Sequence, residues 1–119
     1  MLLKALAVGS GGFVGAVLRY LVSTAMQRYT GTFPWATLGI NILGCLLIGL
    51  VQPPLDVKGR ELYLAFFVPG ILGGFTTFSA FGHETHGLVQ REAPGLAALY
   101  VAASVLLGLG AVWLGRAAR

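Results

Sequence analysis

The sequence predicts an all-α membrane protein of four transmembrane helices, the third of which is broken near its middle. Of the 119 residues, 56% are hydrophobic and only 10% are charged, and the mean hydropathy is +0.82. A soluble domain of this size cannot bury so much apolar surface, so the lipid bilayer is the expected solvent. Four stretches approach the ~20 mostly apolar residues of a spanning helix. We therefore expect residues 1–119 to form one four-helix transmembrane domain.

The first predicted helix covers about residues 4–27. The stretch is too long for a signal peptide and contains Arg19. Gly11 and Gly15 have the GxxxG spacing that lets helices approach closely in lipid. Arg19 lies about four residues, or ~6 Å, beyond the centre of the span. We expect it to pair with another group or to snorkel to the interface, with attraction of an anion as a second interpretation.

The second predicted helix covers about residues 34–52 and ends before the pair Pro53-Pro54, which cannot continue it. Thr37 and Asn41 are four residues apart and so share one face. A threonine hydroxyl in a membrane helix commonly bonds to a carbonyl of its own helix. The asparagine amide cannot satisfy both of its donors in that way. Asn41 is therefore expected to bond either to another helix or to a passing solute.

The third predicted helix covers about residues 62–90, with a break at residues 73–76. The run from Gly70 to Phe81 reads GILGGFTTFSAF, and its glycines and hydroxyls disfavour an uninterrupted helix. Non-helical backbone at membrane depth is tolerated only where it is buried in protein or lines a polar cavity. This run is accordingly the first candidate for a functional site.

Aromatic and hydroxyl-bearing residues alternate at the end of this run. Phe78 and Phe81 are interleaved with Thr77 and Ser79. Because the edge of an aromatic ring is electropositive, ring edges together with O–H and N–H groups form a lining of donors. Such a lining suits an anion better than a cation, and the sequence places no carboxylate at mid-membrane.

The residues that follow the run do not predict an enzyme. His83 and His86 are three apart, but a closed metal site needs further ligands. A hydrolase built from Ser79, His83 and Glu84 is disfavoured, because adjacent residues on one helix point apart. We read this part as a polar segment leaving the membrane.

The fourth predicted helix covers about residues 93–116, and the charges lie mostly at helix ends. Tyr100 and Ser104 share one face of this helix. The net charge of +4 indicates anionic lipid headgroups as partners rather than nucleic acid. The basic residues favour cytoplasmic termini only slightly, which leaves open that copies insert in both orientations. Since four thin helices enclose a pore poorly, we also expect an oligomer.

Three motifs in the right order and spacing resemble the small bacterial and archaeal fluoride channels called Fluc or CrcB. Residues 11–20, GGFVGAVLRY, resemble the first-helix pattern GGxxGAxxRY. Residues 34–41, PWATLGIN, are similar to P-[WF]-x-T-L-x-x-N, and residues 70–81 are similar to GxxGGxTTFSTF. The resemblance covers nearly the whole chain. It departs from the pattern at Ala80, where threonine is usual, and at Gly108, where a further hydroxyl is often found.

The resemblance implies a passive fluoride-selective channel of the cell (inner) membrane that exports fluoride from the cytoplasm and so protects it. It implies an antiparallel, dual-topology homodimer with two pores. Asn41 would coordinate the ion and Phe78 and Phe81 would turn ring edges towards it. The rest of the implied ion pathway consists of hydroxyl-bearing residues: Thr37, Thr77, Ser79, Tyr100 and Ser104.

The resemblance also implies a structural sodium ion and two flanking charged residues. Backbone carbonyls of Gly73 and Thr76 would hold Na⁺ at the dimer interface, and its charge would favour a nearby anion. Arg19 would lie in a vestibule and Glu84 near a pore end. Fluoride is strongly hydrated, so such a pore must replace its water with good donors and still release it.

Two other functions compete with a channel. A proton-coupled exporter of the small multidrug resistance type also has about four short helices, but it needs a titratable carboxylate within the membrane, and the first helix has none. In a small structural subunit, polar residues would only join helices. Asn41 and the broken third helix argue against the structural subunit, though less decisively.

Overall fold

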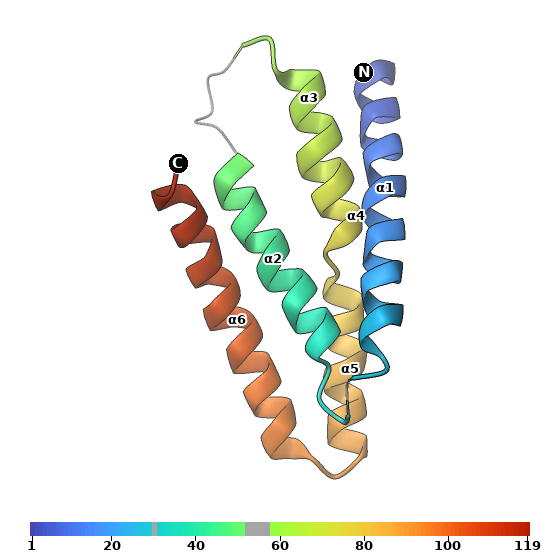
Figure 1. The fold of residues 1–119 in the computed structure, drawn as a ribbon, viewed down its shortest axis with the longest axis vertical. Coiled ribbons are helices and arrows are strands. Elements are labelled where there is room, and N and C mark those ends of the chain that lie inside the picture. Colours follow the sequence, from blue (N-terminus) through green and yellow to red (C-terminus); the bar gives the residue numbers. More distant parts are fainter. Residues whose placement is uncertain (30, 52–57) are drawn as a thin grey trace.

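The regular structure in the described part of the chain is entirely helical (Figure 1). The computed structural model describes residues 1–29, 31–51 and 58–119. The prediction of an all-α protein is confirmed. In chain order the elements are α1 (Leu2–Met26), α2 (Trp35–Val51), α3 (Glu61–Ala65), the π-helix η1 (Phe66–Leu72), α4 (Gly73–Phe75), α5 (Phe78–Gln90) and α6 (Pro94–Ala117).

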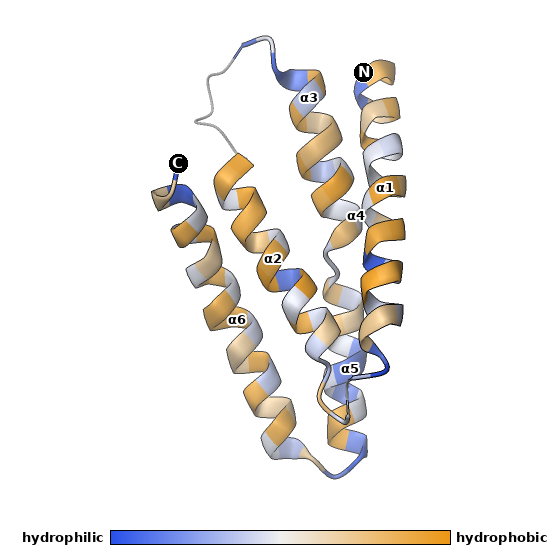
Figure 2. Ribbon diagram, viewed as in Figure 1, coloured by the Kyte–Doolittle hydropathy of each residue, from blue (hydrophilic) through white to orange (hydrophobic). Residues whose placement is uncertain are grey.

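Three helical segments are long and apolar enough to cross a membrane: α1, the composite segment Glu61–Gln90, and α6. At most 22% of the most apolar stretch of each is buried inside the chain, and Figure 2 shows apolar residues along α1, α6 and the first half of the composite segment, with hydrophilic residues on α5. The protein is therefore a multi-pass membrane protein. With 17 residues, α2 is shorter, and its predicted end at Gln52 and the pair Pro53-Pro54 lie outside the described residues.

The helices associate in two pairs: α1 runs beside α3, η1 and α4, while α2 runs beside α6 (Figure 1). Glycines allow the first of these close approaches. A Cβ atom added to Gly15 would lie 2.8 Å from the backbone nitrogen of Phe75, and one on Gly11 would lie 3.0 Å from the Cα of Gly70. The prediction that the GxxxG pair of α1 serves close packing is confirmed.

Glycines also allow the close approach of α2 and α6. A Cβ atom on Gly115 would lie 3.0 Å from the Cα of Gly49, and one on Gly49 would lie 3.1 Å from the Cα of Gly115. No side chain fits between the two backbones at this point. Both chain ends lie at the same end of the bundle (Figure 1).

The break in the third segment exists, but it begins only at Thr76, the last residue of the predicted range 73–76. Residues 73–75 are helical, with φ −62° and ψ −37° at Gly73, and the extended residues are Thr76 (φ −83°, ψ 157°) and Thr77 (φ −151°, ψ 123°). The glycines are needed for packing: a Cβ on Gly74 would lie 3.1 Å from the Cα of Gly12. The Thr77 hydroxyl accepts from the Ala80 N–H at 3.1 Å and so caps the new helix. The other helix bounds that fall on described residues lie within two residues of the predicted ones.

The π-helix before the break was not predicted. It contains Pro69, which has no N–H to donate and would leave the Ala65 carbonyl unpaired in an α-helix. A π-helix pairs each N–H with the carbonyl five residues back, as the Gly73 N–H does with the Val68 carbonyl. The proline inside an apolar stretch was the signal that could have indicated it.

Candidate functional site

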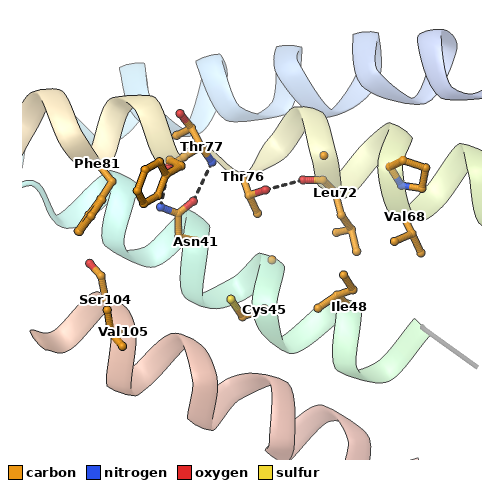
Figure 3. A pocket seen from close by; sticks show the side chains of 14 residues that line it. Asn41, Cys45, Ile48, Val68, Leu72, Thr76, Thr77, Phe81, Ser104 and Val105 are labelled. Carbon is orange, nitrogen blue, oxygen red and sulfur yellow. Dashed lines mark hydrogen bonds between the residues drawn. The ribbon is translucent and has the colours of Figure 1, made fainter. Parts of the chain in front are cut away.

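A pocket of about 520 Å³ lies between α2, α6 and the broken third segment (Figure 3). Its wall is largely apolar, with Cys45, Ile48 and Leu72 among the lining residues. Seven residues that the sequence singled out also line it: Asn41, Gly73, Thr76, Thr77, Phe78, Phe81 and Ser104.

Asn41 pairs with the backbone of the break. Its Oδ1 accepts the N–H of Thr77 at 2.9 Å, and its Nδ2 donates to the Thr77 carbonyl at 3.0 Å (Figure 3 draws the first). Asn41 was expected to bond either to another helix or to a passing solute. The structure shows the bond to another helical segment. The amide nitrogen carries two hydrogens, and this pair uses one of them. No described residue accepts from the second N–H, and Asn41 lines the pocket.

The Thr76 side chain packs closely against α2 beside this pair, because Gly44 of α2 has no side chain. A Cβ there would collide with the Thr76 side chain. Gly44 lies three residues after Asn41 and so on the same face of α2. The methyl group of Thr76 is the part nearest Gly44, and its hydroxyl donates to the Leu72 carbonyl at 2.8 Å (Figure 3).

Ser104 presents an unpaired hydroxyl to the pocket. Its Oγ is buried and has no hydrogen-bond partner within the described part of the chain. A buried hydroxyl without a partner costs about 1–3 kcal/mol, so such groups usually meet water or a ligand. In Figure 3, Ser104 on α6 lies across the pocket from Asn41, close to Phe81.

The two phenylalanines differ in their surroundings. Phe78 is 83% exposed, whereas Phe81 packs against the buried cluster that contains Leu38, Leu88 and Tyr100. Their ring centroids are 5.6 Å apart with 37° between the planes, and the Phe81 ring is 5.1 Å from that of Tyr100. Phe81 therefore lines the pocket and also packs against the buried cluster where α5 meets α6.

A second polar group lies beyond Phe81, around Glu84. The Thr37 hydroxyl donates to its Oε1 at 2.7 Å and the Tyr100 hydroxyl to its Oε2 at 2.9 Å. The expectation that Thr37 bonds to its own helix was therefore wrong, because a carboxylate from α5 offers a stronger acceptor. This convergence was not predicted, although Tyr100 is fully buried and needs a partner.

Two predicted site residues lie outside both groups. Ser79 is exposed, with its Oγ 3.3 Å from the Thr77 Oγ1. Arg19 is half-buried on α1, and its Nε donates to the Gly74 carbonyl at 3.1 Å. The pairing expected for Arg19 is confirmed, and its partner is a backbone carbonyl next to the break.

Comparisons with known proteins identify the family of this chain. The family described as CrcB-like protein, Camphor Resistance (CrcB), matches residues 6–116. A protein of Novosphingobium aromaticivorans is 48% identical over 113 residues, which cover 91% of this chain and 89% of the relative. One of Flavobacterium psychrophilum is 46% identical over 111 residues, with 91% and 90% covered. A third, of Agrobacterium fabrum, is 43% identical over 116 residues, with 92% and 90% covered.

All three relatives are named fluoride-specific ion channel FluC. The family match and the relatives each extend over about nine tenths of the chain or more. The family match, over residues 6–116, thus includes the helix break and both polar groups. The chain belongs to the CrcB-like family.

Proposed function

We propose that this protein is a passive fluoride-selective channel of the cell membrane through which fluoride leaves the cytoplasm. The observation that carries the proposal is the chemistry of the membrane-embedded pocket: its described lining offers hydrogen-bond donors and no ionised side chain. The names of the relatives point to the same ion. A passive pathway needs no site that couples transport to another ion. The protein acts as a channel and not as an enzyme.

Fluoride is held by donors that replace its water. The second N–H of Asn41 and the Ser104 hydroxyl supply two of them, since neither is used within the pocket. The ring edges of Phe78 and Phe81 supply weaker, electropositive contacts. Thr77 contributes by fixing Asn41 through its backbone. Because these donors are few and neutral, they can release the ion again.

The pathway continues from the pocket past Phe81 to the Glu84 group. Thr37 and Tyr100 give their hydroxyl protons to the Glu84 carboxylate, so a passing anion competes with Glu84 for these donors. We assign Glu84 to a position near a pore end, where it would control access to these hydroxyls. Ser79, beside Thr77, extends the polar surface on the exposed side, and Arg19 lies towards a vestibule.

The functional unit is an antiparallel homodimer of four-helix chains with two pores. A single chain leaves Phe78 83% exposed at the pocket, and a second copy would cover it. Both chain ends lie at one end of the bundle (Figure 1), as four crossings require. The small difference in basic residues between the two ends permits insertion in both orientations.

A structural sodium ion fits the carbonyls next to the break. The Gly73 carbonyl would accept the Thr77 N–H in an unbroken helix, but that N–H bonds to Asn41. The Thr76 carbonyl belongs to an extended residue. Unwound carbonyls of this kind are the oxygen ligands that hold Na⁺ in membrane proteins. When bound between two copies, the ion adds positive charge near the anion pathway.

Reconstitution into liposomes loaded with fluoride tests the proposal. We expect rapid fluoride release driven by its own gradient, no measurable chloride release, and no requirement for a pH gradient. Protein-free liposomes are the control. Absence of fluoride release from well-incorporated protein would refute the channel, and strict dependence on a proton gradient would indicate a coupled transporter.

A further inference from the structure

We propose that Arg19 is a positioning residue that holds the broken third segment from the α1 side, and that its contribution to conduction comes from a hydrogen bond rather than from its charge. The inference rests on the proposed function and concerns the same pathway. Arg19 is 55 residues away from the carbonyl that its Nε contacts at 3.1 Å. This contact ties α1 to the residues directly before the break.

The carbonyl that Arg19 contacts is one that the break releases. In a continuous helix the Gly74 carbonyl would accept the N–H of residue 78. The extended residues Thr76 and Thr77 prevent this bond, and an unpaired carbonyl at membrane depth is costly. The Nε–H of Arg19 supplies the missing donor, and its charge also lies at the negative end of the helical segment.

The packing of α1 against α4 keeps this donor in place. A Cβ on Gly74 would lie 3.1 Å from both the Cα of Gly12 and the backbone nitrogen of Ala16, so the two backbones are in contact. Arg19 lies three residues after Ala16, on the same face of α1. The Arg19 side chain is itself half-buried.

Two residues on different helices hold the backbone at the break, Arg19 on α1 and Asn41 on α2. Arg19 on α1 binds the Gly74 carbonyl, and Asn41 on α2 binds both backbone groups of Thr77. Phe78 follows directly and begins α5. Loss of either contact therefore loosens the segment that carries Phe78 and shifts the second N–H of Asn41 relative to the pocket.

Two substitutions separate the hydrogen bond from the charge. In Arg19→Gln, the amide nitrogen occupies the place of the arginine Nε, counted in bonds from Cα, so the donor stays and the charge is lost. In Arg19→Lys, a methylene occupies that place, so the charge stays and the donor moves. Arg28→Gln is the matched control, because it removes a positive charge near the same end of α1 without contact to the break.

Fluoride release is measured at low and at saturating fluoride, together with hydrogen exchange of a peptide covering residues 74–80. We expect Arg19→Gln and Arg28→Gln to conduct and exchange nearly like the wild type. Arg19→Lys should lower release by a similar factor at both concentrations and speed exchange of the peptide about tenfold or more, since a bond to a charged donor is lost.

The opposite pattern overturns the inference. If Arg19→Lys behaves like the wild type and Arg19→Gln loses release only at low fluoride, the charge attracts the ion and the hydrogen bond is incidental. Unchanged exchange in Arg19→Lys has the same consequence. If the wild type itself releases no fluoride, the proposed function fails, while the exchange comparison still decides whether Arg19 holds the break.

Discussion

Replacing Ser104 with alanine should make the protein more stable and less conductive. The Ser104 Oγ is buried and has no partner in the described part of the chain, so the hydroxyl is desolvated without a compensating bond. Its removal should raise the free energy of unfolding by up to about 1–3 kcal/mol. A residue that only joins helices would give the opposite sign.

The loss of conduction follows from the same hydroxyl. A hydrogen bond to a charged partner contributes about 1.5–3 kcal/mol, and each ~1.4 kcal/mol corresponds to about tenfold in rate. If the hydroxyl stabilises fluoride as it passes, Ser104→Ala should slow release by about tenfold to about hundredfold. Stability is measured by SDS-induced unfolding in mixed micelles, and release by a fluoride electrode with proteoliposomes.

Ser10→Ala is the matched control, since the Ser10 hydroxyl bonds to the Ala7 carbonyl of its own helix at 3.0 Å and is exposed. We expect it to leave fluoride release unchanged. A marked loss of stability in Ser104→Ala would show that the hydroxyl has a partner in the protein. Release at the wild-type rate would remove Ser104 from the pathway.

Three further groups of substitutions test the site and the packing. Asn41→Leu leaves two backbone groups unpaired and should lower the free energy of unfolding by about 2–6 kcal/mol and abolish release; an unfolding curve like that of the wild type would contradict the pairing. Phe78→Ile and Phe81→Ile should each impair release while crosslinking still detects the dimer, and only the latter should also destabilise the chain; normal release in both would make them packing residues. Gly15→Ala should destabilise by at least about 1–3 kcal/mol through overpacking, whereas Gly110→Ala, with open space around it, should not; equal unfolding curves would refute the close helix contact.

The helices could be predicted from the sequence because lipid leaves a spanning segment few alternatives. Every backbone group must be paired within the segment, so a long apolar stretch is a helix. The existence of the break was predictable because the glycines and hydroxyl-bearing residues between Gly70 and Phe81 disfavour an uninterrupted helix. Its position was not, because a glycine in a membrane helix serves either a bend or a close contact. Gly74 serves the contact with α1, and the bend falls on Thr76 and Thr77.

The sequence identified the individual polar residues but could not show which groups they bond to. Thr37 and Asn41 are one turn apart on α2, about 6 Å along its axis. That distance is enough for one to reach Glu84 and the other to reach Thr77. Tyr100 and Ser104 divide in the same way on α6, the first bonding Glu84 and the second facing the pocket. The way the helices cross determines which of these residues meets which partner.

The sequence by itself determined the membrane environment, the helical class, the family motifs and the set of polar side chains at bilayer depth, because composition and local spacing carry these properties. Only the tertiary structure decided that Asn41 and Arg19 pair with backbone groups on the two sides of the break, and that the Ser104 hydroxyl is left without a partner among the described residues. A hydrogen bond between helices depends on the distance between backbones. Here that distance is set by glycine contacts such as those of Gly15 and Gly74, whose partners lie far away in the sequence.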